Sequence, residues 1–428
     1  MENVSRLRIV AAGAVGNVLE WYDFAVYGYF ATYIGQVFFP QQDKVAQVLS
    51  AFGIFAVGFL MRPIGGALFG HVGDRIGRRA ALNVSIAAMA IPTFLIGVLP
   101  GYQELGLAAP VLLTLLRMVQ GLSVGGEYTT SIVFLVERAN PERRGLAGAV
   151  ADVGGVFGIL AGSASGAVLE TVISASAMQA WGWRIPFWIG LGVGVIGLLL
   201  RRSLPGDEAA TAVKPRQSPL IATFASHGVL LAQLAGVSAF AAVSFYLMFV
   251  YIVSWLQFVD GVSPARALDI NTISMMLIIP VELGVAWLGD RLGRWRLLLA
   301  ITALGFVSAW PLFWLLHRPE SWLILAGQFG FVLTVAGFYG CLPAFMVEVV
   351  PRGVRCTATA LGYNLSLGVI GGLSPLAATW LVDRTGNDYS PAFMIMAAAA
   401  ISFVALLSMR TTWATRPAAV IPGPAAGD

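Results

Sequence analysis

The sequence predicts an all-α membrane protein with twelve transmembrane helices in two similar six-helix halves. Of its 428 residues, 58% are apolar and only 11% are charged, and the mean hydropathy is +0.80. A soluble domain cannot hide so much apolar surface in one core, so lipid is the expected solvent. About twelve apolar segments reach the roughly 20 helical residues that a bilayer requires. Motifs that recur between the halves complete the argument.

The expected spans alternate with short loops rich in glycine, proline or charge. The first six lie near 9–35, 46–69, 80–100, 108–136, 145–169 and 184–202. The polar stretch at 201–219 cannot lie in lipid and is interpreted as a loop. The second six lie near 228–258, 268–289, 297–316, 322–348, 357–381 and 391–410. The predicted division is a first half at 1–202, a cytoplasmic linker at 203–226, a second half at 227–410 and a disordered tail at 411–428.

Basic residues predict how the chain sits in the membrane. Loops on the side that holds the N-terminus contain most of the 26 Lys and Arg residues, whereas the opposite loops contain only Lys44, Arg184, Arg266, Arg318 and Arg384. Loops rich in arginine stay in the cytoplasm. Both termini are therefore expected to be cytoplasmic, in a multi-pass protein of a bacterial inner (plasma) membrane. The first span lacks a small-residue cleavage site and is expected to be retained rather than removed as a signal peptide.

Two internal repeats link the halves. The sequence GDRIGR at 73–78 recurs as GDRLGR at 289–294, in the equivalent loop after the second span of each half. After the fourth span, Glu137 precedes Arg144 by the same seven residues that separate Glu348 from Arg355. Duplicated halves are the architecture of a carrier that rocks around a central site.

Five segments carry a resemblance to a known family: GNVLEWYDF at 16–24, FLMRPIGGALFGHVGDRIGRR at 59–79, RMVQGLSVGGEYTTS at 117–131, WGWRIPF at 181–187 and RRSLP at 201–205. Together they resemble the metabolite:proton symporter branch of the major facilitator superfamily, which includes carriers of citrate, oxoglutarate, shikimate and osmoprotectants. The resemblance implies the major facilitator fold, alternating access, and a proton as coupling ion with no other cofactor.

The resemblance also implies a gate at the cytoplasmic loops. Asp74 is expected to meet the N-terminus of the eleventh span near Thr357 when that side is closed. The residues assigned to gating are Asp74, Arg75 and Arg78 with their counterparts Asp290, Arg291 and Arg294. Some of these arginines are expected only to fix the topology.

Ionisable groups inside the spans are candidates for proton coupling, because charge in hydrocarbon is costly. Glu20 and Asp23 lie one turn apart on the first span. Counting the helical rise places Asp23 about 22 Å from Arg8, and Arg117 about 10 Å from Pro110 on the descending fourth span, so the two can pair. The resemblance makes Arg117 the basic residue of the fourth helix that is associated with proton coupling.

Other buried charges receive weaker assignments. Glu127, at mid-membrane, could be a second proton carrier, a substrate contact or a carboxylate satisfied by its neighbours. Asp152 and Glu282 lie close enough to predicted span ends to reach water or headgroups. Arg62, in the RP pair typical of the branch, is expected to have a structural role near the cavity wall.

Candidate substrate contacts are polar or aromatic side chains on spans that line a central cavity. They are Arg117, Tyr22, Tyr27, Gln120, Tyr128, Thr129, Tyr246 and Gln328. Small residues on the fifth span, from Gly154 to Gly166, permit close helix contact. This run lacks the glycine-proline pattern typical of drug-exporting antiporters, which makes a drug/proton antiporter less favoured.

The predicted function is proton-coupled uptake of a small organic acid. Similarity to citrate-type carriers near 99–113 and 371–391 favours this substrate, although the last six spans offer no midspan Lys or Arg for a second carboxylate. The alternative is a symporter of zwitterionic osmoprotectants such as betaine or proline, which requires aromatic faces for the ammonium group. Known carriers of this kind have a long heptad tail that 411–428 lacks, so osmosensing is not expected.

Further classes are disfavoured. No nucleophile-base pair indicates an enzyme, and no symmetric filter motif indicates a channel. The three histidines and two cysteines show no metal-ligand spacing, and no basic run with interleaved aromatics suggests nucleic acid. The expected partners are a small-molecule substrate and the lipid bilayer, with the monomer as the functional unit.

Overall fold

A computed structural model describes residues 6–39, 50–51, 53–54, 57–202, 219–262 and 264–410. Throughout these residues the regular elements are helices. The predicted tail, most of the predicted linker and part of the second predicted span lie outside the described residues.

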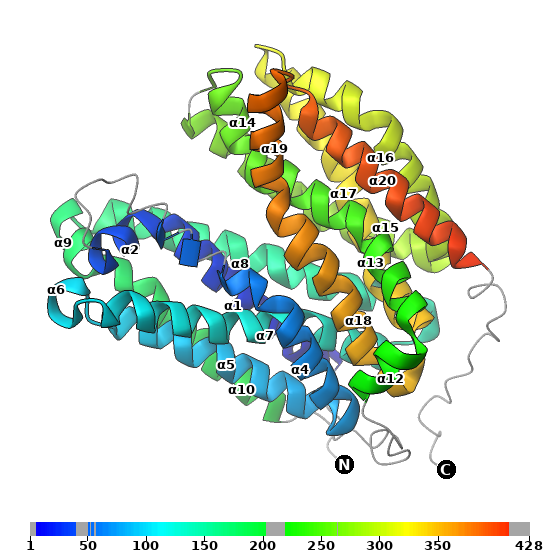
Figure 1. Cartoon of the computed structure of the whole chain (residues 1–428), viewed down its shortest axis with the longest axis horizontal. Helices are drawn as coiled ribbons and strands as arrows, with labels where there is room; N and C mark the ends of the chain where they lie inside the picture. The colour runs from blue at the N-terminus through cyan, green and yellow to red at the C-terminus, as the bar shows by residue number, and fades with distance from the viewer. Residues whose placement is uncertain are drawn as a thin grey trace.

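The first half contains the helices that precede residue 203 (Figure 1). Its long helices are α1 (Arg6–Tyr29), α4 (Arg62–Arg75), α5 (Arg78–Val98), α7 (Ala108–Arg138), α8 (Arg144–Val172) and α10 (Ile185–Arg202). Shorter elements on its connections are α2 (Ala31–Phe38), α6 (Tyr102–Leu105), η1 (Pro141–Arg143), α9 (Ala175–Ala180) and η2 (Gly182–Arg184).

The second half repeats this plan with two interrupted spans. The seventh span consists of α13 (Gly228–Phe245), the π-helical segment η3 (Tyr246–Tyr251) and α14 (Ile252–Phe258), and the eleventh of α18 (Arg355–Asn364), the π-helical η5 (Leu365–Gly371) and α19 (Gly372–Thr385). The others are α15 (Pro264–Leu292), α16 (Arg294–Leu316), α17 (Ser321–Val349) and α20 (Ser390–Ser408), with η4 at Arg352–Val354. The sequence did not predict the two π segments, a feature that often marks functional sites.

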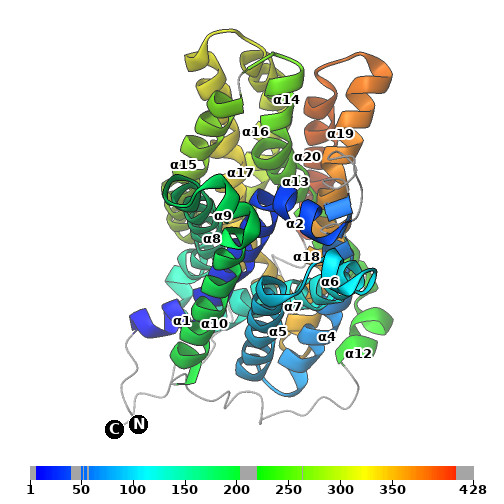
Figure 2. The ribbon, with the colours of Figure 1, turned by 90° about the vertical axis from the view of Figure 1, so that its left-hand side faces the viewer.

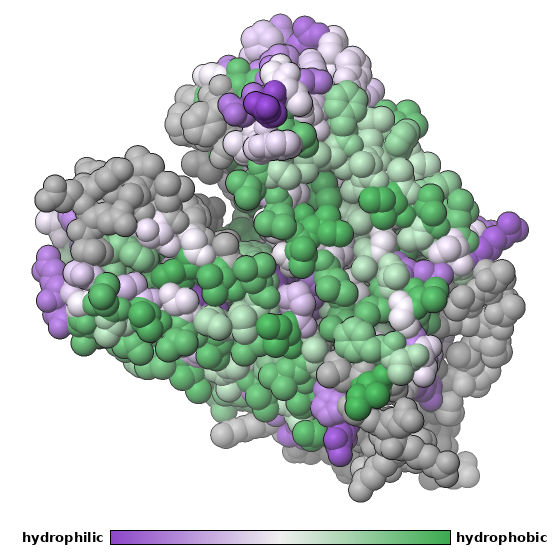
Figure 3. Space-filling view, viewed as in Figure 1, coloured by the Kyte–Doolittle hydropathy of each residue, from purple (hydrophilic) through white to green (hydrophobic). Residues whose placement is uncertain are grey.

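Ten of the described helices are long and apolar enough to cross a membrane. The first span, which carries Glu20 and Asp23, is not among them, and the second contains residues outside the described set. Apolar side chains cover much of the face of both halves that Figure 3 shows, and many large apolar residues are exposed on the described helices. The all-α fold with two six-helix halves is therefore confirmed.

The predicted linker at 203–226 differs from the structure at its second end. Arg201 and Arg202 lie in the last turn of α10, as the predicted span at 184–202 requires, although the polar stretch at 201–219 was interpreted as a loop. Pro219–Ser226 forms a short helix, α12, which packs against α4, α13 and α18. The exact boundaries of the two halves otherwise stay predictions.

The halves meet along α8, which packs on α15 and α17, and along α4, which packs on α18. They touch on the side that carries the α4–α5 and α15–α16 turns, called here the closed side. On the opposite, open side they diverge and leave a hollow between them (Figures 1 and 3). Figure 2 shows the same separation of α2 and α9 from α14 and α19 in side view.

Glycines on α8 allow α1 to approach it closely, as the sequence predicted. A Cβ on Gly154 would lie 3.0 Å from the carbonyl oxygen of Ala14, and one on Gly155 would lie 2.7 Å from the Trp21 ring. This packing fixes where the ionisable face of α1 points.

Candidate functional site

Two aspartates seal the closed side in equivalent ways. Asp74, at the end of α4, accepts hydrogen bonds from the backbone N–H of Cys356 (3.0 Å) and Thr357 (2.8 Å), in the first turn of α18. Asp290 accepts from the N–H of Gly145 (2.7 Å) and from that of the following leucine (3.1 Å), in the first turn of α8. A helix N-terminus has free N–H groups and a positive dipole end, so each carboxylate binds the opposite half. The predicted contact of Asp74 is present, and its gating role stays a prediction.

Reciprocal ion pairs flank this seal. Glu137 pairs with Arg355 of the other half at 2.8 Å, and Glu348 pairs with Arg144 at 3.7 Å. The repeated spacing in the sequence thus corresponds to two symmetry-related bridges. It had not been predicted that each glutamate would reach across to the arginine of the opposite repeat.

The predicted gating arginines have different surroundings. Arg78 bridges Asp74 (3.5 Å) and Glu137 (3.3 Å), and Arg294 binds Glu348 at 2.9 Å as well as Asp290. Arg75 and Arg291 are exposed. Of the two arginines in each repeat, the second one, Arg78 or Arg294, therefore joins the seal, whereas the first is exposed.

Asp23 and Arg117 form a buried ion pair, as helical rise predicted. An Arg117 Nη1 lies 2.6 Å from an Asp23 oxygen and donates to Gln120 at 2.8 Å. The other Asp23 oxygen accepts from Gln120 Nε2 (2.8 Å) and Thr93 Oγ1 (2.9 Å). The guanidinium lies over the ring of Tyr27, 4.3 Å from its centre. This network belongs entirely to the first half.

Glu20 lies beside Arg62, with 3.8 Å between the charged atoms, and both side chains are buried. Arg62 Nε donates to Asn364 of α18 at 3.3 Å, and Asn364 donates in turn to the Gly125 carbonyl at 2.6 Å. Arg62 thus ties the halves together beside the cavity, in keeping with its expected structural placement.

Glu127 is held by a partner that sequence reasoning missed. It pairs with Arg201, which is 0% exposed, and accepts a hydrogen bond from Ser85. Arg201 had been counted as a cytoplasmic loop residue. The last turn of α10 instead packs on α5, where the guanidinium of Arg201 donates a hydrogen bond to the Leu82 carbonyl. Of the three readings of Glu127, the satisfied carboxylate agrees best with this geometry.

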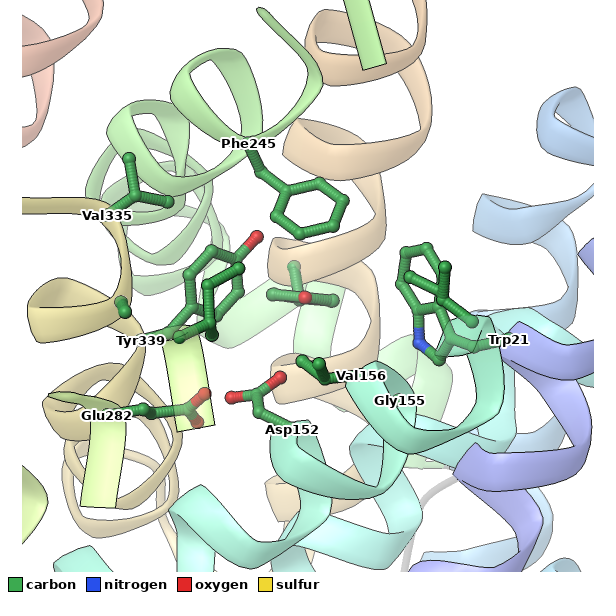
Figure 4. Close-up of a pocket in the computed structure, with 12 residues that line it drawn as sticks. Trp21, Asp152, Gly155, Val156, Phe245, Glu282, Val335 and Tyr339 are labelled. Carbon is green, nitrogen blue, oxygen red and sulfur yellow. The ribbon is translucent and has the colours of Figure 1, made fainter. Parts of the chain in front are cut away.

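A cavity of about 450 Å³, part of it open to solvent, lies between the halves. Its wall is mainly apolar, built from aromatic and aliphatic side chains, and it also contains two carboxyl groups (Figure 4). Trp21 and Phe245 face each other across the halves, with ring centres 5.7 Å apart. The remaining lining residues are Asp152, Gly155, Val156, Ile159, Ile278, Glu282, Val335, Ala336, Tyr339 and Tyr363.

Asp152 and Glu282 require a correction. They were expected to escape toward water or headgroups, yet Glu282 is 1% exposed and both line the cavity. Counting residues from a helix end gives depth, but it cannot tell that α8 and α15 turn these faces toward each other.

None of the eight predicted substrate contacts lines this cavity. Tyr22 donates to the Pro186 carbonyl (2.9 Å), Thr129 bonds its own helix, and Gln328 donates to the Met248 carbonyl (2.7 Å). Tyr128 and Tyr246 lie closer: the first stacks on Tyr363, and the second packs on Phe245. Within the described chain, no group of three His, Cys, Asp or Glu side chains is placed to hold a metal.

A cavity between two helical bundles, sealed on one side only, is the arrangement of an alternating-access carrier. Residues 13–375 match the model of the Major Facilitator Superfamily, and the chain belongs to this family of membrane transporters. It is 35% identical over 421 residues to the "Glycine betaine/proline/ectoine/pipecolic acid transporter OusA" of Dickeya dadantii, covering 95% of this chain and 84% of that protein. It is 34% identical over 425 residues to the "Proline/betaine transporter" of Salmonella typhimurium, with 96% and 84% covered.

Solved structures show the same fold. The proton:xylose symporter XylE bound to 6-bromo-6-deoxy-D-glucose superposes with a TM-score of 0.74 at 19% identity, covering 96% of each chain. The inward-open form of XylE from E. coli gives a TM-score of 0.61 at 17% identity, with 96% of each chain covered.

Proposed function

We propose that the protein is a proton-coupled symporter that imports small zwitterions of the betaine and proline class. The substrate class is suggested by two relatives that share about a third of their residues with this chain over nearly its whole length. The cavity supplies independent physical support for the same class.

The observation that carries the proposal is the lining of the cavity. It presents aromatic rings and two carboxyl groups, and none of the described lining residues is basic. A quaternary or secondary ammonium binds well against aromatic faces, especially where a negative charge lies near. The hydroxyl of Tyr363 can donate to the carboxylate end of the same molecule. Tyr339 lies in the same wall, and its hydroxyl donates to the Ala241 carbonyl at 3.5 Å.

The organic acid that the sequence predicted as substrate is less well supported than the zwitterion alternative. Arg117, the predicted contact for a carboxylate, is already bound by Asp23 and Gln120. A di- or tricarboxylate would instead bring further negative charge toward Asp152 and Glu282, which is electrostatically unfavourable. A zwitterion adds no net charge to the cavity.

The positive-inside rule assigns the sides. Arginines gather on the closed side, which we therefore place in the cytoplasm of a bacterial inner membrane, with the cavity open to the outside. In this state the carrier would accept both substrate and proton from the external medium. Rocking of the halves would then deliver them to the cytoplasm.

The proposal is tested by uptake into vesicles that contain the purified protein as a monomer. Radiolabelled glycine betaine or proline should accumulate faster as external pH falls, and a protonophore should stop accumulation. Phe245→Leu should weaken substrate affinity because it removes an aromatic face, whereas Phe306→Leu, on an exposed surface of α16, should not. Accumulation of a carboxylate that neither betaine nor proline competes with would overturn the proposal.

A further inference from the structure

Two carboxyl groups from opposite halves face each other in the cavity wall. Asp152 projects from α8 and Glu282 from α15, and their oxygens point toward one another (Figure 4). Asp152 Oδ2 and Glu282 Oε1 are buried and have no hydrogen-bond partner among the described residues. Each residue lies eight positions along its helix from the seal formed by Asp290 and the start of α8, which is about 12 Å.

The groups that face this pair are neutral in their ordinary state. They are the hydroxyls of Tyr128, Tyr339 and Tyr363, from α7, α17 and α18. Trp21 and Phe245 complete the wall from α1 and α13. None of the described salt bridges involves either carboxyl group, so no basic side chain of the described chain neutralises them.

Two ionised carboxylates in contact within a low-dielectric wall repel each other strongly. A single shared proton removes the repulsion and leaves one negative charge on the pair. That charge suits the cationic end of a zwitterion. The pair can therefore hold a proton and still favour the proposed substrate.

The two carboxyl groups differ from the buried ion pairs in that they belong to opposite halves. Asp23 and Arg117 both belong to the first half, and so do Glu127 and Arg201. A rigid-body movement of one half against the other leaves such pairs intact. It must, however, change the distance between a group on α8 and one on α15.

We propose that Asp152 and Glu282 form a proton-binding site that exists only while the closed side is sealed. In the outward-open state the pair takes one proton from water in the cavity. When the closed side opens, α8 and α15 separate near the seal, each carboxyl group meets cytoplasmic water, and the proton leaves. The inference rests on the proposed proton coupling and assigns it a site.

A native thiol allows the site to be tested without substrate. Cys356 is buried at the seal, where a Cβ on Gly73 of the other half would lie 3.2 Å from its sulfur. Opening of the closed side should expose it to N-ethylmaleimide. In a Cys341→Ala background, the labelling rate of Cys356 in purified full-length protein therefore reports how often the closed side is open.

The comparison is made from about pH 6 to about pH 9 among the parent protein, Glu282→Gln, Asp152→Asn and Glu142→Gln, whose carboxyl group is exposed on the closed side. Dividing each rate by that of denatured protein at the same pH removes the intrinsic reactivity of the thiol. The parent and Glu142→Gln should label faster as pH rises, by up to about tenfold per pH unit for one proton. Both pair variants should show a flat profile and slow labelling.

The two pair variants provide independent tests should one of them fail to fold. A parent profile that is flat, or pair variants that keep the parent slope, would overturn the proton site. If zwitterion uptake is proton-driven but these profiles do not change, the proposed function stands and the site is wrong. If the profiles change as expected but no zwitterion is transported, the site stands and the substrate assignment is wrong.

Discussion

Replacement of Asp74 by asparagine is expected to weaken the seal on the closed side. The carboxylate accepts hydrogen bonds from the N–H of Cys356 (3.0 Å), and from the N–H (2.8 Å) and hydroxyl (2.9 Å) of Thr357. Hydrogen bonds to a charged group contribute about 1.5–3 kcal/mol each, and a negative charge at a helix N-terminus adds up to about 2 kcal/mol. Asparagine keeps one acceptor but directs an NH₂ group at a donor.

The closed arrangement should therefore lose about 2–4 kcal/mol relative to the open one. This loss corresponds to about 30- to 700-fold in the ratio of the two states. The labelling rate of Cys356 should rise by a comparable factor, because a thiol that is 0% exposed at the seal reacts when the closed side opens. Asp383→Asn, which alters an exposed carboxylate of α19, is the matched control. A folded Asp74→Asn protein that labels at the parent rate would show that this contact does not hold the gate.

Three further predictions concern single contacts. Gly70→Ala should also speed the labelling of Cys356, because its Cβ would lie 2.7 Å from a backbone atom of α18, whereas Gly284→Ala meets open space and should have no effect. Asp23→Asn should keep the pH dependence of Cys356 labelling, because the pair with Arg117 lies within one half and is not changed by rocking; a flat profile would move the coupling site from Asp152 and Glu282 to this pair. Glu127→Gln should lower stability by about 3–5 kcal/mol, because it leaves Arg201 buried without its counter-charge; thermal unfolding measures this loss, and the further change Arg201→Met should restore much of it.

The parts of the structure that were predictable depend on local rules. Span lengths follow from bilayer thickness, and the depth of Asp23 and Arg117 follows from the rise of an α-helix. Each argument needs only the sequence and one known length, the bilayer thickness or the helical rise per residue. For the same reason the fold class and the Asp23–Arg117 pair agree with the structure.

The missed features depend on how helices rotate and tilt against each other. Arg201 begins a polar stretch, which favours interpreting it as a loop residue. In the structure it lies in the last turn of α10, donates to the Leu82 carbonyl of α5 and pairs with Glu127. Tyr22 was a plausible cavity residue, but its hydroxyl turns to the Pro186 carbonyl within the first half. A sequence fixes the spacing of side chains along a helix, whereas the direction of each face is decided by packing with other helices.

The repeated Glu–Arg spacing contained information about the seal. It was used to predict the duplicated halves but not the ion pairs between them. The Glu–Arg spacing repeats after the fourth span of each half, with an acidic residue always seven positions before a basic one. Because the two loops are related by a pseudo-two-fold axis, the glutamate of each loop lies opposite the arginine of the other loop. The pairs Glu137–Arg355 and Glu348–Arg144 follow from this symmetry.

The seal is nearly symmetric, but the cavity behind it is not. The first half lines it with Trp21 and with Asp152 and small or aliphatic residues of α8, whereas the second half contributes three aromatic rings and Glu282 among aliphatic side chains. A symmetric seal can open and close without favouring either half. We expect an asymmetric cavity to give a zwitterion one defined orientation, and the proposed proton site on a carboxyl pair that spans the halves would make protonation depend on their relative position. The residues that repeat between the halves therefore form the seal that is expected to open and close. The residues that have no counterpart line the cavity in which we propose that the substrate binds.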